Sequence, residues 1–247
     1  MRTRHSLLGG SNADRWINCP PSALAEQNHP DTTGATTVED TIAHALAEHK
    51  LRCFFHLEPK RKPVIPDEYA AEMERHTDAY VSFIASHIPQ GSQLWVETRV
   101  RFDQWVAGGF ATVDAIAITD NALHVFDFTY DKNTQAEAGN HSYLKLYALG
   151  AYQMVRNLYS IEKIYGHIFR PRRDHVSSMH INLDELLDWA KNTVRPAGDQ
   201  AWRGEGRRKT GLWCTFCRAR TSCEEHAIEN LQHPIHTKDN PNSHHFL

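Results

Sequence analysis

Apolar residues recur at helical spacing over much of the chain. Between residues 36 and 52, Ile42, Leu46 and Leu51 follow the 3.6-residue period that places side chains on one face of a helix. Asn182 is a suitable N-cap for a later apolar segment. The pattern predicts helices over residues 14–28, 36–52, 67–88, about 139–158 and 183–193.

In the middle of the chain the period changes to two. Segments rich in Val, Ile and Trp alternate with polar positions and are separated by Gly108-Gly109 and Asp120-Asn121, which are typical of turns. The pattern predicts strands over residues 94–102, 110–118, 122–130 and 164–170. Since the turns between the first three are short, these strands are expected to form an antiparallel meander.

This order of elements predicts an α/β fold with a central mixed sheet flanked by helices. At 247 residues, the chain is long enough for one such core with additions at both ends. The predicted segments are an N-terminal helical part (1–90), the core (91–195), a basic, cysteine-rich cap (196–230) and a disordered, His-rich tail (231–247).

Composition limits the setting and the partners. No stretch approaches the roughly 18–20 consecutive apolar residues of a membrane helix, and the N-terminus lacks the apolar centre of a signal peptide. A cytoplasmic protein without a membrane partner is expected. The formal net charge is −3, but seven basic and two acidic residues fall between Arg195 and Arg220. This run, which includes Arg207, Arg208 and Lys209, suits phosphate contacts, with a solvated face as the alternative.

The five cysteines are unevenly placed. Cys214, Cys217 and Cys223 read C-x2-C-x5-C, a spacing that lets thiolates share one metal centre. Since thiols stay reduced inside cells, metal binding is favoured over disulfides. With His226, these three cysteines could form a local Cys3His zinc site. Cys53, between Arg52 and Phe54, is expected to be a plain buried thiol.

Two aspartates interrupt apolar strands. Asp114 and Asp127 lie within Val-, Ile- and Phe-rich segments, where a carboxylate is costly unless a cation or hydrogen-bond donors satisfy it. Carboxylates on neighbouring strands form a hard-oxygen site suited to Mg²⁺ or Mn²⁺. Such a metal would serve phosphodiester hydrolysis, whereas strand-end aspartates that cap turns are the alternative reading.

The order of these motifs resembles the PD-(D/E)XK nuclease superfamily, in its RecB-like and AddB-like iron–sulfur branch with phage-encoded and CRISPR-adaptation exonucleases. An aspartate is followed by a D-x-(K) strand and a helix with L-x-x-Y-A. The resemblance extends over residues 11 to 225. The supporting N-terminal motifs are S-x4-W-x2-C-P-x-S at Ser11, Trp16, Cys19, Pro20 and Ser22, and E-x-T-x-x-H at Glu39, Thr41 and His44.

The resemblance implies a restriction-endonuclease-like core and a role for each matching residue. His44, Asp114, Asp127 and the carbonyl of Phe128 would hold the divalent metal. Glu97 would orient a ligand or contact DNA. The four cysteines Cys19, Cys214, Cys217 and Cys223 would hold a structural [4Fe–4S] cluster that joins the chain ends.

Two positions depart from the superfamily pattern. The lysine of D-x-K is Thr129, and the glutamine of Q-x-x-x-Y is Tyr143, while Tyr147 matches the tyrosine near the DNA backbone, with core packing as its alternative. A threonine hydroxyl cannot neutralise charge on a phosphate as lysine does. Lys132 or Lys145 could supply the missing ammonium.

Two functions are therefore expected from this sequence. The first is a phage-type DNA nuclease, an exonuclease dependent on Mg²⁺ or Mn²⁺, acting on DNA with a free end or single-stranded DNA. The second is a catalytically degenerate relative that binds DNA, a partner nuclease or a second copy of itself without cutting.

Overall fold

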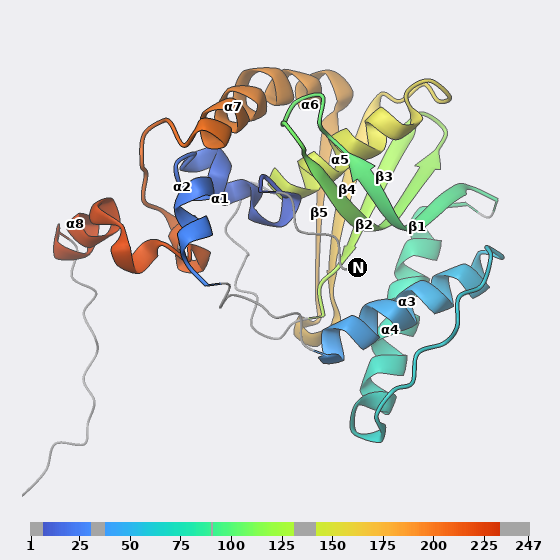
Figure 1. Ribbon diagram of the computed structural model, residues 1–247. Coiled ribbons are helices and arrows are strands. Elements are labelled where there is room, and N and C mark those ends of the chain that lie inside the picture. The colour runs from blue at the N-terminus through green and yellow to red at the C-terminus, as the bar shows by residue number, and fades with distance from the viewer. Residues whose placement is uncertain (1–6, 31–37, 90, 131–141, 233–247) are drawn as a thin grey trace, which may run out of the picture.

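The computed structural model describes residues 7–30, 38–89, 91–130 and 142–232. A five-stranded sheet in the order β1-β2-β3-β4-β5 forms its centre (Figure 1). The first three strands are antiparallel, β4 is parallel to β3, and β5 is antiparallel to β4. The predicted meander and mixed sheet are confirmed. The strands are β1 (Gln93–Arg101), β2 (Phe110–Thr119), β3 (Ala122–Phe128), β4 (Lys163–Arg170) and β5 (His175–Asn182).

The fifth strand was not predicted. β5 pairs with β4 alone and forms an edge of the sheet. Its side chains are half-buried or exposed in alternation, and the sequence His-Val-Ser-Ser-Met-His-Ile-Asn is correspondingly polar. A strand with this little apolar signal cannot be told from a loop by periodicity.

Helices lie in each predicted segment, but α7 and α8 were not predicted and the first segment is divided. Residues 14–28 do not form one helix, because Pro20 and Pro21 lack the amide hydrogens needed inside it and separate two short helices. Asn182 caps α6 as predicted, and it also forms a capping box with Glu185. The helices are α1 (Ala13–Asn18), α2 (Ser22–Ala25), α3 (Val38–Phe54), α4 (Asp67–His87), α5 (Ser142–Val155), α6 (Leu183–Trp189), α7 (Arg195–Arg203) and α8 (Glu224–Gln232).

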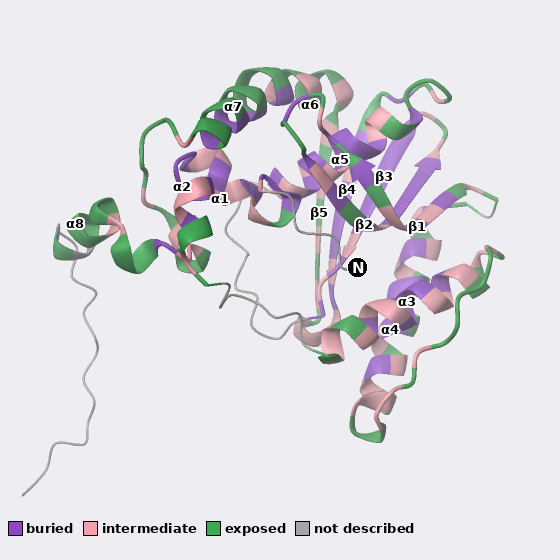
Figure 2. Cartoon of the chain, in the orientation of Figure 1, coloured by how far each residue is buried: buried purple, intermediate pink, exposed green. Residues whose placement is uncertain are grey.

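Helices cover both faces of the sheet (Figure 1). α5, the crossover between the parallel strands β3 and β4, packs on one face together with α1, α6 and α7. α3 and α4 pack on the other face. Figure 2 shows the buried residues concentrated on the central strands and on the helix sides that face them. The segment after α7 lies beside the N-terminal helices α1 and α2, so two segments about 200 residues apart in the sequence are neighbours.

Two buried histidines pair across β3 and β4. His124 and His167 are 7% and 3% exposed, with His124 Nδ1 3.4 Å from His167 Nε2. Burial and the nearby His87 lower the pKa of His124 to about 4 and that of His167 to about 3. Both rings are therefore neutral in the folded protein at neutral pH.

We expect this pair to make the protein acid-sensitive. An unfolded histidine takes up a proton near pH 6.5, whereas the folded pair resists protonation until pH 3–4, so the free energy of unfolding should fall as the pH drops from 6.5 to 4. The loss should be on the order of several kcal/mol. Urea titrations at pH 7 and pH 4.5 measure it. A His124→Phe/His167→Phe protein should lose much of this slope, and the exposed His180→Phe should retain it.

Within the described ranges, the structure contains no helix long and apolar enough to cross a membrane.

Candidate functional site

Three acidic residues lie in one row across β1, β2 and β3. Val96 pairs with Ala115 and Thr98 with Val113, so Glu97 and Asp114 lie opposite each other. The β2–β3 pairing ends at Ala115 and Phe126, and one further step of the same register sets Asp114 opposite Asp127. Like charges at opposite positions destabilise a sheet unless something neutralises them. This row is therefore a natural place for a cation.

The sheet is distorted at the acidic pair. Val96 and Val100, four positions apart on β1, should point to the same face of the sheet. They instead pack into the hydrophobic cores on opposite faces. Val113 and Ala115, two positions apart on β2, are likewise divided between the cores. The inward and outward alternation of side chains therefore reverses on both strands at Glu97 and Asp114. Glu97 also has a φ of +49°, a conformation that costs a non-glycine residue energy and is enriched at functional sites.

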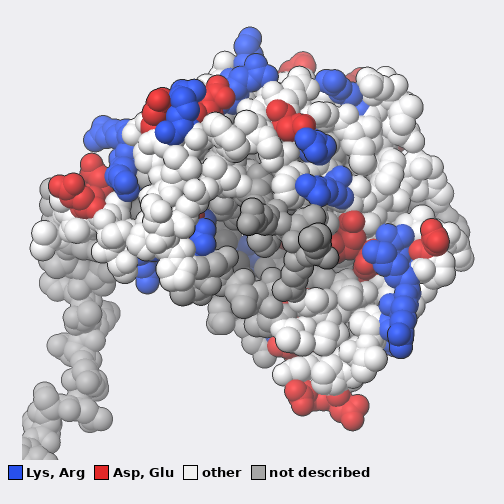
Figure 3. All heavy atoms as spheres, in the orientation of Figure 1, with Lys and Arg blue, Asp and Glu red and all other residues white. Residues whose placement is uncertain are grey.

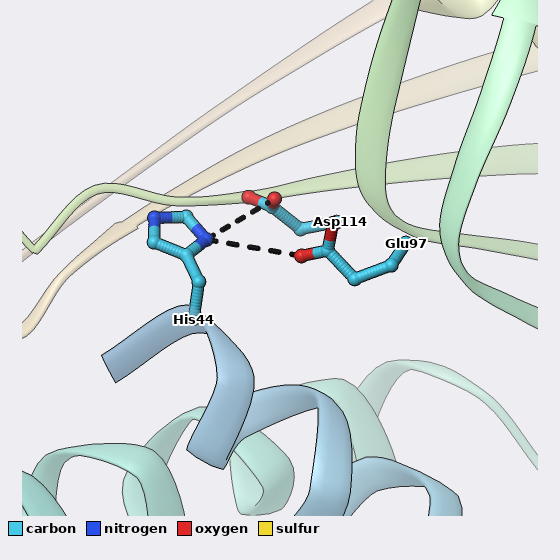
Figure 4. A group of neighbouring side chains, drawn as sticks. All are labelled: His44, Glu97 and Asp114. Carbon is cyan, nitrogen blue, oxygen red and sulfur yellow. Dashed lines mark ion pairs between the residues drawn. The ribbon is translucent and has the colours of Figure 1, made fainter. Parts of the chain in front are cut away.

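His44 approaches this pair from α3. Its Nδ1 lies 3.3 Å from Asp114 Oδ1 and 3.9 Å from Glu97 Oε1. Figure 4 shows the imidazole and the two carboxylates pointing toward one another from the helix and the sheet. One ligand atom from each residue lies within 4.8 Å of the others, and no other such group of His, Cys, Asp and Glu occurs in the described part of the chain. The two carboxylates suit Mn²⁺ or Mg²⁺, whereas an imidazole is a ligand typical of transition metals.

Hydrogen bonds hold the two aspartates of the row in place. The Phe128 amide donates to Asp114 Oδ2 at 2.7 Å, which fixes that carboxylate. Asp127 Oδ2 accepts hydrogen bonds from the hydroxyls of Thr129 (2.8 Å) and Tyr143 (3.3 Å). The residue at the lysine position thus binds the second aspartate directly. A role for the Phe128 carbonyl as a metal ligand stays a prediction.

The site is over-supplied with negative charge. Burial and the neighbouring Asp114 raise the pKa of Glu97 to about 8. Burial and Asp114 also raise the pKa of Asp127 to about 6, against the hydrogen bonds from Thr129 and Tyr143. Burial would lower the pKa of His44, but Asp114, with Asp40 and Glu97 in support, raises it to about 10. Protons therefore occupy the place that a divalent cation would take.

Of the two candidate lysines, the structure describes only Lys145. Lys132 lies outside the described residues. Lys145 Nζ lies 5.1 Å from the centroid of the Trp189 ring, while Tyr143, two positions earlier on α5, binds Asp127. Since residues two apart on a helix do not share a face, Lys145 is directed away from Asp127.

Tyr147 occupies a position between the site and the core. Its ring packs against Gly10, where even a Cβ atom would overlap it, and meets the Tyr143 ring edge-on at 5.5 Å. The core-packing alternative for Tyr147 thus has direct support, and its contact with DNA stays a prediction.

A second constellation lies at the joined chain ends. Cys19, Cys214, Cys217 and Cys223 line one small pocket, with a cavity volume of about 20 Å³ and an opening to solvent, together with basic residues and His226. Burial raises the pKa of the Cys214 and Cys217 thiols, so both stay protonated at neutral pH and must release protons when a metal centre binds. The donor set and the shared pocket fit a metal centre bound by four cysteines.

Ion pairs and hydrogen bonds hold this pocket together. Arg15 Nη2 lies 2.8 Å from Glu26 Oε2, and Arg15 Nη1 donates to the Phe216 carbonyl at 3.1 Å. The Arg218 amide donates to Glu26 Oε1 at 2.8 Å. Cys19 is thereby brought to the C-terminal cysteines, which lie almost 200 residues later.

Cys53 does not behave as predicted. It is exposed on α3, and its sulfur lies 3.8 Å from His49 Nε2. The buried positions of this helix are Ala43, Leu46, Ala47, Glu48 and Leu51, and Cys53 points away from them. The expectation of a buried thiol was wrong, because position 53 lies outside the face of α3 that packs on the core.

The basic run follows α7. Arg207, Arg208 and Lys209 are exposed, and the last two also line the cysteine pocket. In Figure 3, Lys and Arg side chains lie over α7 and the segment after it, with acidic side chains among them. The surface here is therefore mixed in charge, and Arg207, Arg208 and Lys209 form an exposed run of three consecutive basic residues on it.

A comparison of the sequence with known families gives one match. The family model described as "Protein of unknown function (DUF2800)" matches residues 5–245. The chain belongs to this family. The description assigns no activity, so the resemblance to PD-(D/E)XK nucleases stays a prediction for this DUF2800 protein. A solved structure titled "Crystal structure of SSO0001" is similar at 12% identity, covering 83% of this chain and 95% of that chain, with a TM-score of 0.35. A TM-score this low carries no argument.

Two residues near the candidate site were not predicted from the sequence. Asp40 lies one turn before His44 on α3, with its Oδ1 3.7 Å from His44 Nε2. Carboxylates in this position orient metal-binding histidines. Arg172, just after β4, pairs with Glu39 on α3. The i,i+4 spacing of Asp40 and His44 could have revealed the first, whereas nothing in the sequence joins Arg172 to Glu39.

Proposed function

We propose that this protein is a divalent-metal-dependent DNA nuclease, acting as an exonuclease, with a structural [4Fe–4S] cluster. The observation that carries the proposal is the meeting of His44, Glu97 and Asp114 within 4.8 Å, on a strained row of carboxylates across three strands. Sheets avoid such a row without a cation. The order of motifs, which resembles that of PD-(D/E)XK nucleases, supports nuclease activity over other metal-dependent functions.

Each residue has a proposed role in hydrolysis. His44, Glu97 and Asp114 would hold the metal, with Asp127 completing the set. The metal would polarise the phosphate and lower the pKa of the attacking water. Asp40 and the Phe128 amide would hold His44 and Asp114 in place. Thr129 and Tyr143 would fix Asp127 through their hydroxyls.

The spacing of the cysteines favours a cluster over zinc. Four ligands about 2.3 Å from one zinc ion lie about 3.8 Å apart. No three of the cysteine sulfurs, all of which belong to described residues, come within 4.8 Å of one another. A larger centre such as [4Fe–4S], which four cysteine thiolates usually hold, suits this wider spacing. A cytoplasmic location, where thiols stay reduced, suits it too.

A degenerate, non-cutting relative is the second candidate. Thr129 uses its hydroxyl to bind Asp127, and Lys145 is directed to Trp189. Neither then supplies an ammonium to the phosphate. In that case the row of acidic residues would still bind a metal, and the protein would bind DNA or a protein partner without cutting. Cleavage that appears in Thr129→Lys but not in the parent would favour this candidate.

DNA binding is expected to depend on the basic run. Replacing Arg207, Arg208 and Lys209 together by alanine should weaken binding to DNA of any sequence and reduce the salt slope by about 2–3, because each phosphate contact releases a counterion. Fluorescence anisotropy with a labelled oligonucleotide over a range of KCl concentrations measures the slope. A charge-matched control replaces Lys60, Arg61 and Lys62, which lie on the other side of the sheet beside α3 and α4. Equal slopes for the parent and the Arg207/Arg208/Lys209 variant would return the run to a solvated face.

The nuclease proposal itself is tested with linear DNA. Protein purified without oxygen should degrade a linear duplex or single strand when Mn²⁺ is added and not in EDTA. Asp114→Asn should remove that activity, whereas Asp103→Asn should not. Asp103 lies just after β1 and pairs with Arg101, outside the acidic row.

A further inference from the structure

The side chain of Arg172 is largely enclosed and contacts three other segments of the chain. Arg172 lies in the short helical turn Pro171–Arg173 after β4, and its side chain is 6% exposed. Its Nη2 pairs with Glu39 in the first turn of α3 and lies 3.4 Å from Glu72 Oε2 on α4. Its guanidinium carbon lies 4.0 Å from the centroid of the Tyr130 ring, just after β3.

A guanidinium that is largely removed from water needs a compensating partner. Desolvating an arginine is costly unless carboxylates and hydrogen bonds balance it. Here the closest compensation comes from Glu39, 133 positions away in the sequence. Breaking such a pair leaves an uncompensated charge, so the geometry of the pair holds the two segments firmly together.

Glu39 lies in the same turn of α3 as Asp40, which contacts His44. Asp40 follows it directly and lies one turn before His44, which it contacts from the side opposite to Asp114. The guanidinium of Arg172 therefore fixes the end of α3 from which His44 reaches the sheet. A shift of α3 by about 1 Å would be enough to spoil metal geometry, which must hold to within about 0.5 Å.

We propose that Arg172 is a positioning residue for the cation site, setting the approach of His44 to Asp114 and Glu97 through its pair with Glu39. The inference rests on the proposed function, because it assumes that these residues bind a divalent cation. It adds a residue outside the cation site that controls affinity for the metal.

The same pair of helices offers a matched control. Lys50 also joins α3 to α4, with its Nζ 2.6 Å from Glu74 Oε2 and 2.6 Å from Asp78 Oδ1. It lies beyond His44, toward the other end of α3. A residue that merely ties the helices together should act on stability in the same way as Lys50, whereas a positioning residue should also change metal affinity.

The test measures Mn²⁺ affinity by calorimetry, with thermal melting of each metal-free protein beside it. Arg172→Met and Glu39→Gln should each weaken Mn²⁺ binding about 10–100-fold, the usual effect of losing an outer-shell partner. Arg172→Lys should recover part of the affinity, because an ammonium can still pair with Glu39. Lys50→Met should lower the melting temperature and leave Mn²⁺ affinity at the parent value.

The outcomes separate the inference from the proposed function. A parent protein that binds no Mn²⁺ overturns both. A parent that binds Mn²⁺, with Arg172→Met and Glu39→Gln at parental affinity, overturns the inference alone. Weakening by Lys50→Met equal to that by Arg172→Met would do the same. Where Arg172→Met does not fold, Glu39→Gln and Arg172→Lys decide, since each removes less.

Discussion

Replacing Asp114 by asparagine is expected to remove Mn²⁺ binding while the protein stays folded. The amide can still accept the hydrogen bond from the Phe128 amide, so the local geometry should persist. The charge that balances the metal is lost. Asp114 is also the carboxylate that pairs with His44 and lies close enough to Glu97 and Asp127 to raise the pKa of both. The affinity should fall by more than the roughly 100-fold that outer-shell changes reach. Calorimetry with Mn²⁺ measures it, with Asp103→Asn as control.

The parent protein should also show a steep pH dependence of this affinity. The pKa of Glu97 is raised to about 8 and that of His44 to about 10, so both are protonated near pH 7 and must release protons to bind a metal. Affinity should therefore rise with pH by up to about two orders of magnitude per unit below pH 8. A Kd that is constant between pH 6.5 and 8.5 would contradict a site made of these two residues.

Replacing Cys19 by serine is expected to remove the visible absorbance of the purified protein and to destabilise it strongly. The absorbance would arise from thiolate-to-iron charge transfer in a cluster held by four cysteines. Cys19 and Cys214 are almost 200 residues apart, so their cross-link closes a long loop. Removing such a link costs on the order of 5 kcal/mol, which corresponds to a melting temperature about 10–20 °C lower.

Cys53→Ser is the matched control for this experiment. Cys53 is exposed on α3, outside the pocket that the other four cysteines line. This variant should keep the colour and the melting temperature of the parent. Colourless parent protein with one equivalent of zinc would contradict the iron–sulfur proposal. Unchanged colour in Cys19→Ser would remove Cys19 from the ligand set.

The sequence predicted those elements whose side chains have a clear periodic environment. α4 and the strand β1 were found because their buried faces are apolar and their exposed faces are more polar, and β2 was found because it is an apolar, β-branched run between two turns. β5 was missed because an edge strand needs little apolar sequence. The helix expected over residues 14–28 is divided because proline chemistry overrides apolar period at Pro20 and Pro21.

The candidate site was predictable in part. Asp114 and Asp127 were identified as carboxylates in apolar strands, which is a local signal. Glu97 was given a lesser role, because the reversal of alternation that brings it into the row depends on the pairing of two strands. The pair of Arg172 with Glu39 depends on the tertiary fold alone. Local chemistry can thus be read from the chain, whereas contacts between distant segments cannot.

The most direct test of the account is the degradation of end-labelled linear DNA by anaerobically purified parent protein and its Asp114→Asn variant, with and without Mn²⁺. The account predicts loss of full-length DNA with the parent and Mn²⁺ only, and no loss in EDTA or with the variant. Parent protein that binds Mn²⁺ but leaves all DNA forms intact would contradict the nuclease function. Equal degradation by parent and variant would show that the row of His44, Glu97 and Asp114 is not where cleavage occurs.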